Sequence, residues 1–344
     1  MKYLLILILT VGLFSSCIKA VDSQPKKGIK ERRVTRHSQE KNVIRYDKSQ
    51  NCRERMWVTR EAKTRQAYQD IFYSQIVGEE ISYHVTLPPF YHDNRDKEYP
   101  VIYWLHGSGA SMRGVSYLSK LYYGLMKMGS LKEHIIIFPN GLANSMWIDS
   151  ADGCTPVESV MIKELIPYIN NKYRVKTQSD QTTIEGHSMG GYGALRFGFK
   201  YPDIFGKVSA IGPGPLQDDL FQGSEEYIAG IKVRQHVFNT IYGNSSKYYI
   251  ANSPLELSKN YSKNEDRLTL RIIIGTNDDG FSATKIFHNK LLDQKIKHEY
   301  IEMQGIGHSP AEIMNEINSS QIKRKWLRFY NQGNSGKPSP SERQ

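Results

Sequence analysis

The apolar residues of this chain gather in short runs, separated by polar and glycine-rich stretches. Residues 101–105 are continuously apolar and 134–139 nearly so, as strands of a parallel sheet are when both faces are covered. Residues 81–87 instead alternate between apolar and polar, which is typical of a strand with one solvated face. The same reasoning predicts further strands at 181–185, 207–211, 268–274 and 298–303.

Apolar residues at helical spacing lie between these strands. The clearest case is 157–171, and shorter helical patterns cover 193–199 and 283–294. Ser309 is expected to cap a last amphipathic helix. Strands and helices that alternate along a chain predict an α/β fold, in which a mostly parallel sheet has helices on both faces. The segment 216–259 has mixed polarity and many tyrosines, and is interpreted as a small insertion over the functional site.

A serine flanked by glycines stands between the strand at 181–185 and the helix at 193–199. Gly186, Ser188 and Gly190 form the pattern G-x-S-x-G, which in α/β-hydrolases places the serine on a sharp strand-to-helix turn. Glycine is required because a Cβ two residues before or after the serine would push the turn open. We therefore predict that the Ser188 hydroxyl is a nucleophile. The competing interpretation is a tight glycine turn that packs a helix on a strand.

A serine nucleophile needs a histidine base, and the histidine needs an acid that orients its imidazole. Asp278 and His308 each follow a predicted strand, and the chain order Ser, Asp, His is that of α/β-hydrolases. Because loops at the carboxyl ends of parallel strands meet at one edge of the sheet, both side chains are expected near Ser188. Asp279 is a competing candidate for the acid. His187 is next to the serine but is expected to point elsewhere.

The loop 106–109 follows a predicted strand directly and contains two glycines. The backbone N–H groups of Ser108 and Met189 are the predicted donors to an oxyanion, and His106 is expected to shape the loop. Met112 stands where a dinucleotide fingerprint has its third glycine, which argues against a nucleotide site. The sequence has neither H-E-x-x-H nor a Cys/His metal spacing, so we predict no catalytic metal.

Residues 1–20 have the pattern of a signal peptide. A lysine precedes the apolar run 3–14, which is too short to span a bilayer. The sequence Phe14-Ser15-Ser16-Cys17 resembles a bacterial lipobox, which predicts lipidation of Cys17 and membrane anchoring. The alternative is ordinary cleavage near Ala20. Either way the protein is expected to be exported, as a periplasmic, outer-membrane or cell-surface lipoprotein or as a secreted protein.

Positive charge is concentrated in residues 21–66. This segment has fourteen Lys or Arg and six Asp or Glu, a net charge of +8 out of the chain's +11. With few apolar residues it is interpreted as a flexible tether, and the sharper alternative is an arm that contacts anionic envelope polymers or lipid head groups. It lacks regular aromatic interleaving, so no nucleic-acid partner is expected. Residues 67–330 are the predicted globular domain, and 331–344 a disordered tail.

The chain has three cysteines. If Cys17 carries lipid, Cys52 and Cys154 remain, and an exported location permits them to pair. The sequence leaves this pairing open. No base lies near Cys154 in sequence, so it is interpreted as a structural or free thiol rather than a nucleophile.

Several segments together resemble the putative esterase family, which includes feruloyl esterases, S-formylglutathione hydrolases and mycobacterial mycolyltransferases. The resemblance covers roughly Ile71 to Tyr330 and implies an α/β-hydrolase domain, a Ser-Asp-His triad and no cofactor. The family's G-T-x-D segment matches Gly275 to Asp278, which favours Asp278 over Asp279 as the acid. The segments that carry the resemblance are Tyr99–Gly107, Trp147–Ser150, Glu164–Ile169, Gly186–Ala194 and Gly305–His308.

The resemblance and the predicted export together indicate a serine carboxylesterase. Its best match is the feruloyl or acetyl esterase-like branch, whose substrates are acyl groups esterified to carbohydrate. Two alternatives stay open. One is an acyltransferase that moves the acyl group to a sugar or lipid hydroxyl, and the other is a binding protein on a catalytically inactive hydrolase fold.

Overall fold

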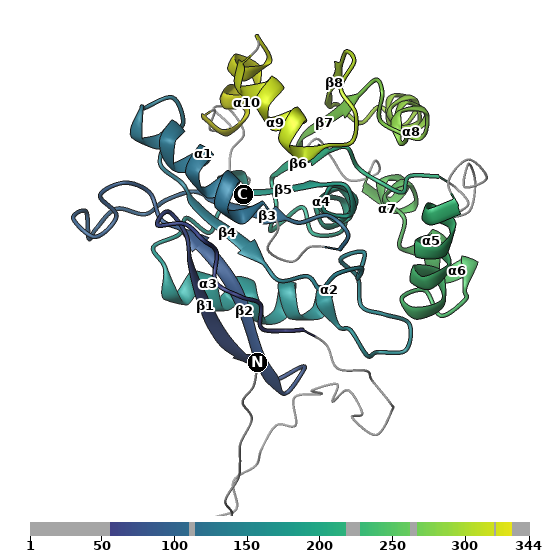
Figure 1. Cartoon of the computed structure of the whole chain (residues 1–344), viewed down its shortest axis with the longest axis horizontal. Helices are drawn as coiled ribbons and strands as arrows, with labels where there is room; N and C mark the ends of the chain where they lie inside the picture. The colour runs from purple at the N-terminus through teal and green to yellow at the C-terminus, as the bar shows by residue number, and fades with distance from the viewer. Residues whose placement is uncertain (1–55, 110–113, 218–227, 262–266, 320, 332–344) are drawn as a thin grey trace, which may run out of the picture. The chain divides into compact units, whose positions relative to one another are not determined.

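The structure is a computed structural model. It describes residues 56–109, 114–217, 228–261, 267–319 and 321–331, with the backbone alone at 228–232 (Figure 1). The predicted signal peptide, Cys17, Cys52 and most of the predicted tail lie outside the described residues.

A single eight-stranded sheet forms the centre of the described domain, in the order β1-β2-β4-β3-β5-β6-β7-β8. The first two strands are antiparallel to their neighbours, and the other six are parallel to one another. This is the mostly parallel sheet that the alternation of strands and helices predicts. The strands are β1 Tyr68–Ser74, β2 Glu79–Thr86, β3 Val101–Leu105, β4 Ile135–Pro139, β5 Thr182–His187, β6 Lys207–Ile211, β7 Thr269–Gly275 and β8 Glu299–Met303.

Helices cover both faces of the sheet. Alternate residues of the buried strands enter two separate apolar cores: on β3, Tyr103 and Leu105 belong to one, and Ile102 and Trp104 to the other. Helices α1, α9 and α10 pack in the core of Trp104, and the remaining long helices in that of Tyr103. The helices of the first group are α1 Val115–Lys127, α9 Pro310–Ser319 and α10 Ile322–Asn331.

The opposite face carries the helix that follows Ser188 and a nearly continuous helix with a π-helical turn in its middle. Figure 1 shows α2 and α3 on the side of the sheet away from α1, α9 and α10. The helical segments of this face are α2 Val157–Val160, η1 Met161–Leu165, α3 Ile166–Lys172, α4 Met189–Lys200 and α8 Phe281–Asp293, and a short 3-10 turn, η2 Ser179–Gln181, precedes β5.

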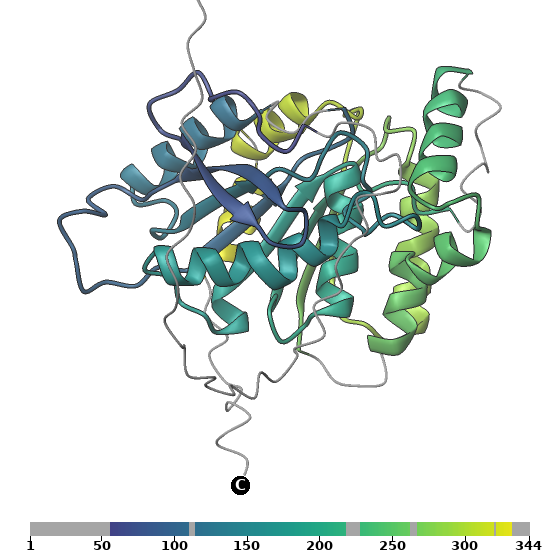
Figure 2. The same cartoon turned by 90° about the horizontal axis from the view of Figure 1, so that it is seen from below.

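The segment predicted as an insertion is helical where the structure describes it. It forms α5 Ile228–Thr240, α6 Ser246–Ala251 and α7 Pro254–Tyr261 between β6 and β7. In Figure 2 these green helices stand together at one end of the sheet. Ser245 caps α6 by accepting a hydrogen bond from the Tyr248 N–H at 3.1 Å.

The ordered domain begins earlier than the predicted boundary at Gln66. Trp57 is only 3% exposed, and the Asn140 side chain donates to the carbonyl oxygens of Met56 and Trp57 at 2.9 and 2.8 Å. The Thr59 N–H donates to Ser82 Oγ at 2.9 Å. The interpretation of residues 56–66 as tether is therefore wrong. The segment is rich in charged residues, so its composition does not reveal the buried side chain of Trp57.

Trp57→Ala is expected to lower the free energy of unfolding by about 3–5 kcal/mol, since it empties the space of a buried indole. Urea unfolding followed by circular dichroism measures the change. Val58→Ala is the matched control, because Val58 is 42% exposed and its truncation is expected to cost less than about 1 kcal/mol. Equal stabilities of the Trp57 variant and the wild type would show that this segment does not anchor the domain.

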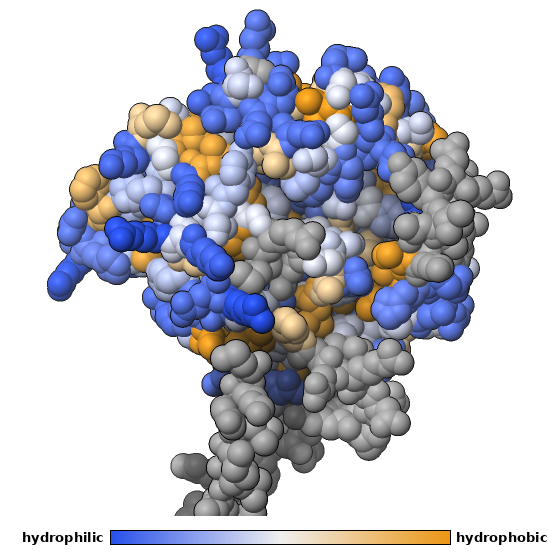
Figure 3. All heavy atoms as spheres, viewed as in Figure 1, coloured by the Kyte–Doolittle hydropathy of each residue, from blue (hydrophilic) through white to orange (hydrophobic). Residues whose placement is uncertain are grey.

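The face of the domain seen in Figure 3 is mostly hydrophilic. On the face seen in Figure 3, blue residues surround smaller apolar areas. None of the helices in the described part of the chain has the length and apolar character needed to cross a membrane.

Candidate active site

Ser188 lies on the sharp turn between β5 and α4. Its backbone has φ 60° and ψ −121°, a strained conformation for a residue other than glycine. A Cβ on Gly186 would lie 2.4 Å from the backbone of Gly190, and one on Gly190 would lie 2.0 Å from the carbonyl oxygen of Leu105. The Ser188 N–H donates to the carbonyl oxygen of Ile211 at 3.0 Å, which ties the turn to β6. Both glycines are therefore required to hold the serine at the carboxyl edge of the sheet.

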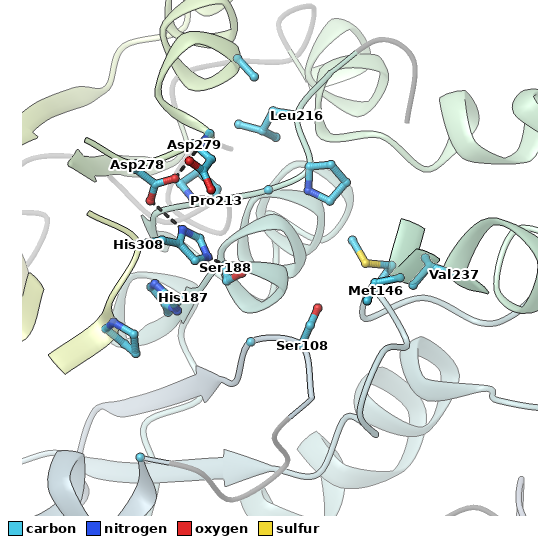
Figure 4. A pocket seen from close by; sticks show the side chains of 18 of the residues that line it. Ser108, Met146, His187, Ser188, Pro213, Leu216, Val237, Asp278, Asp279 and His308 are labelled. Carbon is cyan, nitrogen blue, oxygen red and sulfur yellow. Dashed lines mark hydrogen bonds and ion pairs between the residues drawn. The ribbon is translucent and has the colours of Figure 1, made fainter. Parts of the chain in front are cut away.

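The structure brings the three predicted side chains together (Figure 4). His308 Nε2 lies 2.9 Å from Ser188 Oγ, and His308 Nδ1 lies 2.6 Å from Asp278 Oδ2. Asp278 follows β7 and His308 follows β8, so neighbouring parallel strands deliver the two residues to the same edge. A carboxylate can only accept a hydrogen bond, so Nδ1 carries the proton and Nε2 is free to accept the serine proton.

Asp278 is held in place from two sides. Its carboxylate is 1% exposed, and its second oxygen, Oδ1, accepts a hydrogen bond from the Gly280 N–H at 2.7 Å. Asp279, the competing candidate, is exposed and lines the cavity next to the site. Of the two aspartates, Asp278 is the one whose contact with His308 Nδ1, at 2.6 Å, builds the chain to Ser188.

The hydrogen bond with Asp278 raises the pKa of His308 above its ordinary value, although partial burial of the imidazole opposes this. Only the neutral imidazole can accept a proton from serine, so kcat/KM for an ester is expected to fall as pH drops through this raised pKa. Asp278→Asn removes the main cause of the shift and should move the acid limb to lower pH. Initial rates between about pH 5 and 9 test this, and a limb that stays in place or moves up would contradict it.

The expectation that His187 points elsewhere is wrong. Its side chain lines the cavity, and its ring centroid lies 4.8 Å from that of His308. Burial and the neighbouring His308 lower the pKa of His187 to about 3, so the ring is neutral at ordinary pH. His187 Nε2 is buried and has no hydrogen-bond partner among the described residues. The neutral ring thus packs beside His308 without adding charge.

His106 shapes the loop that follows β3. The Gly141 N–H donates to His106 Nε2 at 3.1 Å, so the proton is on Nδ1, which donates to the carbonyl oxygen of Gly107 at 2.9 Å. Burial lowers the pKa of His106 to about 4. Among the described residues, the N–H groups of Ser108 and Met189 donate to no backbone carbonyl. Met189 is the first residue of α4, where an N–H has no partner within the helix.

A cavity of about 840 Å³ opens beside Ser188. Its lining includes Ser108, His187, Asp278 and His308, and the rest is mostly apolar. Apolar lining residues come from the insertion, from α1 and from α9, among other elements. The sequence predicted that the insertion lies over the site, but it did not connect α1 or α9 with it.

A buried ionic cluster fixes the insertion against the helix of the serine. Arg196 of α4 is fully buried, and its guanidinium donates to Glu158 Oε2 at 2.9 Å, to the Trp147 carbonyl at 2.9 Å and to the Asn252 carbonyl at 2.7 Å. Burial disfavours the Glu158 anion, but Arg196 and Lys200 outweigh this effect and lower the pKa of Glu158 to about 2. The cluster therefore stays charged and joins α4, α2 and the segment between α6 and α7.

Cys154 is disulfide-bonded, so of the two roles that the sequence allowed, the structural one is correct and the free thiol is not. Cys52 lies outside the described residues.

Solved structures with a similar backbone define the class of the fold. A ferulic acid esterase from Anaeromyces mucronatus, in complex with ferulic acid, aligns with a TM-score of 0.55 and 24% identity, over 80% of this chain and 92% of that chain. Identity this low shows the fold alone. The chain has the α/β-hydrolase fold.

Sequence comparison identifies the family. The chain is 29% identical to an esterase of Mycobacterium tuberculosis over 154 residues, 43% of this chain and 33% of that protein. It is also 29% identical to an endo-1,4-beta-xylanase/feruloyl esterase of Xylanibacter ruminicola over 143 residues, 39% of this chain and 20% of that protein. These alignments span a third or less of both relatives. The model of the putative esterase family matches residues 74–319, so the chain belongs to the putative esterase family.

Proposed function

We propose that the protein is a serine carboxylesterase that works through an acyl-enzyme on Ser188. The observation that carries the proposal is the hydrogen-bonded chain from Ser188 through His308 to Asp278, at the wall of a cavity large enough for a substrate. Membership of the putative esterase family supports the same chemistry. The strained backbone of Ser188 presents the hydroxyl rather than burying it, as a nucleophile requires.

In the first half-reaction, Ser188 Oγ attacks the ester carbonyl carbon while its proton passes to His308 Nε2. Asp278 stabilises the imidazolium that forms. The N–H groups of Ser108 and Met189 are the proposed donors to the negative oxygen of the tetrahedral intermediate. The C–O bond to the alcohol then breaks, and the alcohol leaves with the proton from His308.

In the second half-reaction, water attacks the acyl-enzyme and gives a proton to His308 Nε2. The bond from the acyl carbon to Ser188 Oγ breaks, Oγ takes the proton back, and the carboxylic acid leaves. A sugar or lipid hydroxyl that attacked in place of water would give acyl transfer by the same steps.

We propose acyl groups attached to carbohydrate, of the feruloyl or acetyl kind, as substrates. The names of the Xylanibacter and Anaeromyces relatives support this choice. A screen of p-nitrophenyl acetate, methyl ferulate and acetylated xylan, with and without acceptor sugars, tests it. Free carboxylic acid as the main product would support ester hydrolysis. Acylated acceptor sugar as the main product would instead show that the protein is an acyltransferase. If no ester were turned over, the remaining hypothesis would be a binding protein on a catalytically inactive hydrolase fold.

We also propose that the protein is exported and anchored through a lipidated Cys17, with the basic arm directed at anionic envelope polymers. The lipobox-like sequence and the net charge of +8 in residues 21–66 support this location. Export brings the domain to polysaccharide and lipid esters outside the cytoplasm.

Removing residues 21–50 from a Cys17→Ser protein is expected to weaken binding to anionic vesicles at low salt, because exposed charges attract over about one Debye length. The deletion stops before Trp57, so the domain keeps its anchor. Co-sedimentation with phosphatidylglycerol vesicles at roughly 20 and 500 mM salt measures the effect. The two proteins should converge at high salt. Equal binding at low salt would leave the arm only a spacer role.

A further inference from the structure

The cavity beside Ser188 has two apolar walls that belong to opposite faces of the sheet. Leu216 and Val237 pack in the core on the α4 face, whereas Leu118 and Met314 pack in the core on the α1 face. The insertion wall consists of Leu216, Val233 and Val237. The α1–α9 wall consists of Tyr117, Leu118 and Met314.

The α1–α9 wall lies on the side of His308. Helix α9 begins at Pro310, two residues after His308, and the Tyr117 hydroxyl donates to Asn315 Oδ1 at 2.7 Å, which joins α1 to α9. The insertion wall lies elsewhere: Figure 4 shows Val237 across Ser188 from His308. The reacting serine therefore stands between the two walls.

The chemistry of the acyl-enzyme assigns a direction to each part of the ester. The leaving oxygen takes its proton from His308 Nε2, so the alcohol must lie on the His308 side. The carbonyl oxygen lies toward the N–H groups of Ser108 and Met189. The acyl chain is the remaining substituent, and the space left to it is on the side of Ser188 away from His308.

We propose that the insertion wall binds the acyl group and that the α1–α9 wall binds the alcohol. The preferred substrate is then an ester with a bulky apolar acyl group and an alcohol that presents an apolar face to Tyr117. This inference rests on the proposed ester chemistry at Ser188. A cavity of about 840 Å³ is far larger than an acetyl group needs. It falls in the range of roughly 300–1,000 Å³ that holds ligands of drug size.

The acyl assignment is tested with p-nitrophenyl octanoate and p-nitrophenyl acetate, which share one leaving group. Val233→Trp places a larger side chain on the insertion wall and so reduces the space for the acyl group. Val233 is 49% exposed, so the fold tolerates the larger side chain. The ratio of kcat/KM for octanoate over acetate is expected to fall at least about tenfold. Ile250→Trp is the matched control, because Ile250 is 47% exposed on α6 of the same insertion and does not line the cavity.

The alcohol assignment is tested with benzyl acetate and ethyl acetate, whose leaving groups have similar basicity. Tyr117→Ala is expected to lower the benzyl-over-ethyl ratio of kcat/KM by about fivefold or more, through loss of the ring contact. Tyr117→Phe keeps the ring and should keep the ratio. Its hydrogen bond to Asn315 is lost as in the alanine variant, so the pair separates ring contact from helix pairing.

The two ratios should respond separately, the acyl ratio to Val233→Trp and the alcohol ratio to Tyr117→Ala. A reversed pattern, or active variants in which neither ratio changes, would overturn the inference while the esterase proposal stands. A wild-type protein that cleaves none of the four esters would overturn the proposed function and this inference with it.

Discussion

Ser188→Ala is expected to lower kcat for a small soluble ester by roughly three to six powers of ten, with the fold intact. Without the Oγ atom no acyl-enzyme forms, and what remains is the rate that binding and oxyanion stabilisation alone support. Steady-state kinetics with p-nitrophenyl acetate measures the loss, and circular dichroism checks the fold. The methyl group of alanine occupies the place of the serine Cβ, so the turn is not disturbed.

Ser246→Ala is the control for this experiment. Ser246 is exposed at the start of α6 and does not line the cavity, so its loss should leave turnover near that of the wild type. If the Ser188 variant kept more than about a tenth of wild-type activity, another residue would have to be the nucleophile.

Asp278→Asn is expected to lower kcat/KM by roughly two to four powers of ten. An asparagine amide can donate to His308 Nδ1, which would place the imidazole proton on the nitrogen that must accept the serine proton. The substitution also removes the charge that stabilises the imidazolium. Asp278 is 1% exposed, so no water replaces the lost contact readily. Kinetics on the same soluble ester measures the loss.

Asp279→Asn is the matched control, one residue away in the same loop. Asp279 is exposed, and its charge also raises the pKa of His308. We therefore expect a small shift of the acid limb to lower pH and a plateau rate within a few-fold of the wild type. If Asp279→Asn lost most of its activity while Asp278→Asn stayed near the wild type, Asp279 would be the acid of the triad.

The sequence predicts the centre of the sheet well. The runs at 101–105 and 207–211 are β3 and β6 with the same bounds. β3 is apolar throughout, as a strand buried on both faces tends to be, whereas β6 also buries Lys207 and Ser209. The placement of Ser188, Asp278 and His308 at one edge also follows from local patterns. Each ends or follows a parallel strand, and the carboxyl ends of such strands share an edge.

The elements outside the central strands are harder to predict from the sequence. β1 is an edge strand with several exposed positions, so it shows no apolar run. The segment around Trp57 is dominated by charge, and the helices of the insertion have mixed polarity. α1 carries Leu118, Tyr122 and Leu125 at helical spacing, a signal that could have been found. The two walls of the cavity could not be predicted, because their helices lie on opposite faces of the sheet and meet only in the folded domain.

The central claim is that Ser188 is the residue that carries the acyl group. Labelling the wild-type protein with a fluorophosphonate, followed by peptide mapping, tests it most directly, because such reagents stop at the covalent step on an activated serine. We predict one label per chain, located on Ser188, with esterase activity lost in proportion to labelling. Full inactivation with the label on another residue, or complete labelling of Ser188 with activity retained, would contradict the account.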